Sequence, residues 1–153
     1  MYKYTKLTKT LTNYIRGCDM KYHLPFKKKY KLTSPYGWRI HPITKKKQMH
    51  NGCDWATPME TPLYPMAMGC VIGVGKNTLS GNYIRIEHGD GLVTAYAHLK
   101  EVLVKVGECI DTNQVVAKSG MSGRVTGPCL HVTVWTSREL LNTIDPMTII
   151  ANG

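Results

Sequence analysis

The feature that most constrains the fold is a series of short β-type runs that extends from Leu32 almost to the C-terminus. Runs rich in Val, Ile, Thr and Tyr are separated by Gly, Pro, Asn and Asp, which is typical of strands joined by tight turns. No segment after residue 30 has a convincing helical period, and the nearest to one, residues 137–141, forms a single turn at most. Strands are expected over residues 69–74, 82–88, 92–98, 114–118 and 130–135. The pattern predicts a mainly β fold, a single domain of antiparallel sheets.

The first thirty residues differ from the rest of the chain. They are polar and basic, with weak helical character over residues 7–15, and they end in Pro25 and the lysine run 27–29. We therefore expect an N-terminal arm or extension over residues 1–30 and one domain over residues 31–153. A chain of 153 residues is long enough for one domain with a hydrophobic core.

The net charge of the chain indicates which classes of partner it can attract. The formal net charge is +10, from 20 Lys and Arg against 10 Asp and Glu. A basic surface attracts polyanions such as nucleic acid, anionic lipid, teichoic acid or the carboxylates of peptidoglycan stems, although a solvated lysine-rich surface explains the same composition. No signature of a nucleic-acid-binding domain accompanies the basic runs, so no specific nucleic acid partner is expected.

The hydrophobic segments argue against a transmembrane helix, and the cysteines argue against a disulfide framework. No apolar stretch approaches the roughly 18–20 residues of a transmembrane helix, and no apolar run follows the first lysines as a secretory signal would require. The five cysteines are odd in number and lack CxxC spacing, which argues against a disulfide framework or a four-cysteine zinc site. Free thiols fit a reducing cytoplasm, and the count leaves room for one or two disulfides.

Two segments contain residue types that bind metals. His50 and Asp54 would lie about 13 Å apart in an extended strand, too far for one ion, but a bend at Gly52 could bring them together. In the predicted strand 130–135, alternation places Leu130, Val132 and Val134 on one face. Cys129, His131, Thr133 and Trp135 share the other face. Each pattern alone is more typical of an ordinary surface or structural position than of a metal site.

A third histidine ends another predicted strand. By the same alternation, His98 shares a face with Thr94 and Tyr96, a polar and aromatic face that suits a groove or a solvated sheet surface.

Taken in order, the motifs resemble those of the LytM/lysostaphin-type zinc peptidases, which cleave peptidoglycan cross-bridges and stem peptides. The resemblance covers roughly residues 32–148. Its motifs are TSPYGWRIHPIT at 33–44, HNGCDWATP at 50–58, GNYIRIEHG at 81–89, YAHL at 96–99, VGE at 106–108, GMSGRVTGP at 120–128 and DP at 145–146. Each motif is modest, but the ordered set is specific.

The resemblance implies a site and a reaction. It makes His50, Asp54 and His131 the ligands of one Zn²⁺ ion, and it makes His98 a catalytic histidine beside that ion. The implied substrate is peptidoglycan, with anionic wall polymers or other virion proteins as further partners. A groove over the metal is expected, with walls from the loops at 36–44 and 119–126 and with Tyr36, Trp38, His41 and Trp135 among its lining residues.

One position departs from the family pattern. The family closes with TGPHLH, whereas this chain has TGPCLH, so Cys129 stands where a second catalytic histidine is expected. A thiol is shorter than imidazole and has an ordinary pKa of about 8.5 against about 6.5. Three outcomes follow: His98 carries most of the acid–base work, Cys129 becomes an extra zinc ligand, or catalysis is lost and wall binding is kept.

The expected function is hydrolysis of peptidoglycan cross-links or stem peptides, for cell-wall lysis by a phage. The alternative is a catalytically impaired domain that serves as a structural or wall-binding part of a phage tail. With no secretory signal recognised, we expect the protein in the virion, or in the host cytoplasm until its release to the wall.

Overall fold

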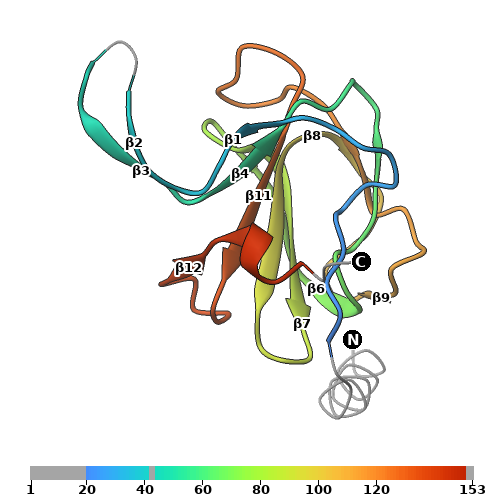
Figure 1. The fold of residues 1–153 in the computed structure, drawn as a ribbon. Coiled ribbons are helices and arrows are strands. Elements are labelled where there is room, and N and C mark those ends of the chain that lie inside the picture. The colour runs from blue at the N-terminus through green and yellow to red at the C-terminus, as the bar shows by residue number, and fades with distance from the viewer. Residues whose placement is uncertain (1–19, 42–43, 151–153) are drawn as a thin grey trace.

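The computed structural model describes residues 20–41 and 44–150, which form a ten-stranded sheet and a separate two-stranded hairpin (Figure 1). Paired strands in both sheets run antiparallel. The main path of the large sheet is β1 (Leu32–Ser34), β4 (Gly52–Trp55), β11 (Leu130–Trp135), β8 (Val93–Val102), β7 (Gly81–His88), β6 (Gly69–Asn77) and β9 (Cys109–Ile110). Off this path lie β5 (Pro62–Leu63), β10 (Ala117–Ser119) and β12 (Thr143–Ile144).

The mainly β, antiparallel fold expected from the sequence is confirmed. Four expected strands correspond closely to β6, β7, β8 and β11, whereas the strand expected over residues 114–118 meets β10 only at its last two positions. The segment 137–141 is not helical, and the helical turn in the described residues is instead η1 (Pro146–Thr148). No described helix is long and apolar enough to span a bilayer.

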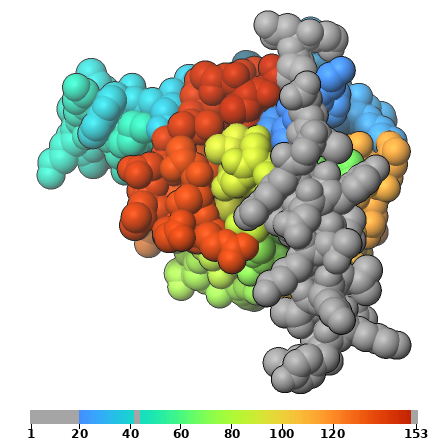
Figure 2. All heavy atoms as spheres, turned by 90° about the horizontal axis from the view of Figure 1, so that it is seen from below, coloured from blue at the N-terminus to red at the C-terminus, as the bar shows by residue number. Residues whose placement is uncertain are grey.

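The hairpin of β2 (Gly37–Ile40) and β3 (Lys47–His50) projects from the body of the protein, as Figures 1 and 2 both show. Cross-strand neighbours share a face, so Trp38 lies beside Met49, while Arg39 lies on the opposite face with His50. Because His50 ends β3, this hairpin carries one predicted metal ligand to the edge of the large sheet.

The core lies beneath one face of the large sheet. Leu130, Val132 and Val134 of β11 are fully buried, as the alternation predicts. Their neighbours His131 and Thr133 point to the other face, where Ala97 and Ala95 of β8 lie directly opposite them. One face of the sheet therefore builds the core and the other is left for a site.

Part of the predicted N-terminal arm packs against this core. Tyr22 and Phe26 are buried, Phe26 contacts Trp55 edge to face, and the Tyr22 hydroxyl donates hydrogen bonds to Asp90. Residues 1–19 lie outside the described residues, so the boundary at residue 30 stays a prediction.

One disulfide is present among the described residues. Cys70 of β6 and Cys109 of β9 are directly opposite in the sheet and are joined by a disulfide bond. Cys53 and Cys129 are free thiols. The count of cysteines had left room for such a bridge without indicating its partners, because these two residues are separated by 39 positions and meet only through strand pairing.

Candidate metal centre

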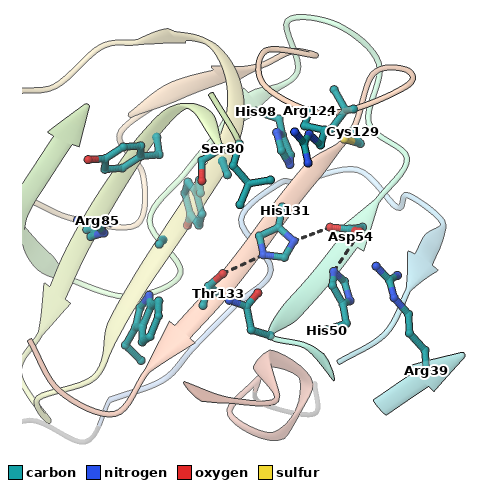
Figure 3. Close-up of a pocket in the computed structure, with 18 residues that line it drawn as sticks. Arg39, His50, Asp54, Ser80, Arg85, His98, Arg124, Cys129, His131 and Thr133 are labelled. Carbon is teal, nitrogen blue, oxygen red and sulfur yellow. Dashed lines mark hydrogen bonds and ion pairs between the residues drawn. The ribbon is translucent and has the colours of Figure 1, made fainter. Parts of the chain in front are cut away.

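Three predicted ligands come together around one carboxylate. The Asp54 Oδ2 atom lies 3.2 Å from Nε2 of His50, and its Oδ1 atom lies 2.6 Å from Nδ1 of His131. One nitrogen or oxygen atom from each residue lies within 4.8 Å of the others (Figure 3). The cluster sits on the outer face of the large sheet, where β3, β4 and β11 meet.

Strand pairing explains this convergence. Asp54 and His131 are direct partners in the β4–β11 ladder, so their side chains project from adjacent strands on the same face. His50 belongs to the hairpin, and the chain turns between the two sheets at Asn51. The separation of about 13 Å expected for one extended strand is therefore avoided.

Gly52 matters for space more than for backbone freedom. It is not among the glycines with a positive φ, so the predicted bend needs no left-handed residue here. A Cβ atom at this position would lie 2.2 Å from the Val132 carbonyl oxygen and 2.8 Å from Nε2 of His131. The missing side chain lets β4 approach β11 and gives the imidazole of His131 its place.

Neighbouring groups fix the histidine rings. Nδ1 of His50 lies 2.9 Å from the Pro35 carbonyl oxygen, which can only accept, so this nitrogen carries a proton. Nε2 faces Asp54, to which it donates a hydrogen bond when the ring is protonated, and it has a lone pair for a metal when the ring is neutral. Nε2 of His131 lies 2.9 Å from the Thr133 hydroxyl. Such outer contacts orient metal-binding histidines in proteins.

The charge of the cluster is set by mutual hydrogen bonding. Burial opposes ionisation of Asp54, but hydrogen bonds from His131 and His50 outweigh it and hold the pKa of the carboxyl well below its ordinary value. The hydrogen bond to Asp54 raises the pKa of His50 against the opposing effect of burial. A carboxylate that stays ionised between two imidazoles is a donor set that fits Zn²⁺, which binds nitrogen and oxygen ligands of this kind and accepts three from the protein.

His98 lies beside the cluster, with its ring centre 6.2 Å from that of His131. Its Nδ1 donates to the Ser122 carbonyl oxygen over 2.9 Å, which leaves Nε2 unprotonated when the ring is neutral. Burial lowers the pKa of His98, and the hydrogen bond to Ser122 only partly offsets this.

The face predicted for His98 requires a correction. Thr94 and Tyr96 were expected to share its face, but both are fully buried, and the Tyr96 hydroxyl donates to the Tyr64 carbonyl oxygen over 2.6 Å. Strand alternation breaks at His98, which has a φ of 63°. This left-handed residue turns the imidazole from the core face toward the metal cluster.

Cys129 is the site residue that departs from the family pattern. It is partly buried, and Figure 3 places it near Arg124 and His98. Burial raises the pKa of its thiol to about 11, with a further contribution from the nearby Asp54 carboxylate. With a pKa of about 11, Cys129 is a neutral thiol at pH 7.

A cavity of about 360 Å³ joins these elements into a groove. The hairpin strand β2 contributes Arg39 to the lining. Lining residues contributed by loops are Asn51, Leu79, Ser80, Arg124 and Val125, and those on the strand floor include Tyr83, Arg85, Ala95, Ala97, Thr133 and Trp135. Arg39, Arg85 and Arg124 lie within the motifs at 33–44, 81–89 and 120–128, but none of them had been assigned a role at the site.

Of the four expected groove residues, Trp135 lines the cavity, whereas Tyr36, Trp38 and His41 lie elsewhere. Trp38 is 66% exposed on the hairpin face opposite Arg39, and Tyr36 hydrogen-bonds to Thr143. The His41 backbone pairs with Lys46 and closes the hairpin. None of the three belongs to the cavity lining, and Arg39 is the hairpin side chain that does.

Comparisons with known proteins agree with this arrangement. A profile of peptidase family M23 matches residues 48–145. Peptidoglycan DD-endopeptidase ShyA of Vibrio cholerae is 41% identical over 108 residues, which are 70% of this chain and 25% of that protein. The chain spans about a third or less of the length of the first curated relatives it matches, 32% and 25%.

Solved structures give the same result. A zinc-containing peptidase from Vibrio cholerae superimposes with a TM-score of 0.75 at 37% identity, covering 86% of this chain and 40% of that one. The catalytic domain of lysostaphin from Staphylococcus simulans superimposes with a TM-score of 0.70 at 30% identity, covering 78% of this chain and 90% of that one.

Proposed function

Because the chain belongs to peptidase family M23, we propose that it is a zinc-dependent endopeptidase that hydrolyses peptide bonds in peptidoglycan cross-links or stem peptides. The observation that carries this proposal is the cluster of His50, Asp54 and His131 on the floor of an open groove, with His98 beside it. The phage setting and the location in a virion or host cytoplasm stay predictions.

Different residues of the groove would bind the metal, exchange protons and leave space for the substrate. His50, Asp54 and His131 would hold the ion, which when bound supplies a Lewis acid that activates water and polarises a peptide carbonyl. Nδ1–H of His98 donates its hydrogen bond to the Ser122 carbonyl oxygen, so Nε2 is the atom available to exchange a proton or a hydrogen bond with the reacting groups. Ala95 and Ala97 keep the floor beside the cluster low, which leaves room for a peptide.

The activity is tested by digestion of purified sacculi with zinc-loaded protein. We expect new amino termini that appear with zinc, disappear on chelation and return when zinc is restored. His23 is exposed and lies outside the groove, so His23→Gln is a matched control that keeps the activity, whereas His131→Gln loses it. Zinc-loaded protein that releases no amino termini from sacculi of several wall types would overturn the proposal.

Cys129 favours a second candidate, a domain that binds the wall without cutting it. Its neutral thiol is a poor substitute for an imidazole that must exchange protons near pH 7. The change Cys129→His separates the candidates. If it converts an inert protein into an active one, the natural domain binds without cutting; if activity is present beforehand and falls, the cysteine is part of the working site. Cys129→Ser tests whether the thiol ligates zinc, because only a ligating thiol predicts that this variant loses zinc affinity.

A further inference from the structure

The groove carries excess positive charge. Three arginines line it, Arg39, Arg85 and Arg124, whereas Asp54 is the acidic residue in its lining, and Asp54 is already held by two histidines. A groove with this balance favours ligands that bring negative charge.

Arg85 is the arginine with the most defined surroundings. It is partly buried on β7, and its guanidinium carbon lies 4.6 Å from the centre of the Tyr83 ring. Stacking on an aromatic face leaves the edge of a guanidinium free to donate hydrogen bonds. Figure 3 places Arg85 across the groove from the metal cluster.

One glycine of β6 makes room for this pair. A Cβ atom at Gly75 would lie 2.5 Å from the Tyr83 hydroxyl oxygen, so any other residue would displace the phenol from its present place across the strand. The bare backbone of β6 at Gly75 thus forms a platform on which the Tyr83 ring lies, and the Arg85 guanidinium stacks on that ring.

The acidic residue nearest to Arg85 along β7 is already engaged. Glu87 is two positions further on the same face, and Arg138 holds it with two hydrogen bonds, one of them 2.7 Å long from Nε to Oε2. None of the ion pairs among the described residues includes Arg85. Its charge is therefore available to a ligand.

The register of the sheet relates Arg85 to the metal cluster. Arg85 is opposite Ala95, Ala95 is opposite Thr133, and His131 is two residues from Thr133. Two strand spacings of about 4.8 Å and one two-residue step of about 7 Å separate the Cα atoms of Arg85 and His131 by roughly 12 Å. That distance corresponds to three or four residues of extended peptide.

We propose that Arg85, seated on Tyr83, binds a free carboxylate of the peptidoglycan stem three or four residues from the bond that is cut. This inference rests on the proposed function, and it assigns to the groove a carboxylate-bearing stem peptide instead of a neutral glycine bridge. A planar guanidinium and a carboxylate form paired, charge-assisted hydrogen bonds, which neither an amide nor a glycine carbonyl reproduces.

Binding of uncross-linked stem peptides tests the inference without requiring catalysis. Calorimetry on the zinc-loaded protein compares a peptide with free carboxylates and the same peptide with those carboxylates amidated. We expect the amidated peptide to bind about 10-fold more weakly to the natural protein, equally to Arg85→Gln, and with an intermediate ratio to Arg85→Lys. Lys105 is exposed and outside the groove, so Lys105→Gln is a charge-matched control that keeps the full ratio.

The platform gives a second variant that leaves Arg85 in place. Gly75→Val displaces the Tyr83 phenol and should lower the ratio while the melting temperature reports whether the fold is kept. Equal binding of both peptides to the natural protein, or an unchanged ratio in Arg85→Gln, would overturn the inference. A protein that prefers the free carboxylate but cuts no cross-link would instead contradict the proposed endopeptidase and leave carboxylate recognition standing.

Discussion

The two halves of the groove are built differently. The metal half takes Asp54 and His131 from directly paired strands, and their mutual hydrogen bonds hold the rings together. The other half takes His98 from a left-handed position within β8 and Cys129 from the end of a loop. Sheet register therefore fixes the first half, whereas loop contacts fix the second.

The loop that completes the second half is fastened by single hydrogen bonds, among them Arg124 N–H to the Leu79 carbonyl oxygen and Cys129 N–H to the Gly120 carbonyl oxygen. The Ser122 hydroxyl donates to the Leu99 carbonyl oxygen over 2.6 Å and accepts from the Asn82 amide, and Gly81 gives the loop room to approach. A Cβ atom at Gly81 would lie 2.3 Å from the Ser122 hydroxyl oxygen. The residue that departs from the family pattern, Cys129, lies in this half, which the ladder between β4 and β11 does not fix, so the comparison shows where the site can change without disturbing the ligand cluster.

The largest expected effect comes from breaking the metal half alone. Asp54→Asn keeps the size of the side chain but removes the charge that both histidines share, so we expect zinc affinity to fall by at least about 100-fold and cleavage to disappear. Zinc content after dialysis against buffered metal measures the first effect, and circular dichroism shows that the sheet is retained. A variant that keeps one zinc per chain with near-natural affinity would contradict the assignment of Asp54 as a ligand.

The next effect separates the halves. His98→Gln removes the proton-exchanging nitrogen without touching the three ligands, so zinc affinity should stay unchanged while turnover falls by about 100- to 10,000-fold. Parallel measurement of zinc content and cleavage of one defined muropeptide decides the matter. Parallel loss of zinc and activity would mean that His98 belongs to the metal half.

The sequence predicts some parts of the fold better than others, and strand length and pairing decide which. Alternation in residues 130–135 predicts which side chains of β11 face the core, because apolar and polar residues alternate along a strand that has one buried face. The two-residue strands β5, β9 and β12 are too short to show any period. Pairing across 39 positions, as between Cys70 and Cys109, has no local signal at all.

The site shows the same limit at single residues. The order of the motifs brings His50, Asp54 and His131 forward as a set, but alternation assigns His98 to the wrong neighbours because a positive φ at a histidine cannot be read from strand pattern. Arg39 and Arg85 lie within quoted motifs, but the motifs give neither of them a role in the groove, because their position there depends on which strands become neighbours. Gly52 was expected to matter for a bend, whereas it matters for the approach of two strands.

The smallest expected effect tests whether the loop positions His98. Ser122→Ala removes the two hydroxyl hydrogen bonds but keeps the backbone carbonyl that accepts from His98. At about 1 kcal/mol for each bond, the free energy of unfolding should fall by about 1–2 kcal/mol. A carbonyl that is less firmly placed should lower kcat about 3- to 10-fold, with KM and zinc affinity unchanged.

Denaturant unfolding and muropeptide kinetics measure these effects, and Thr126→Ala, an exposed change in the same loop, serves as the control. If Ser122→Ala lowers kcat no more than Thr126→Ala does, the loop does not position His98, and the contrast between the two halves fails.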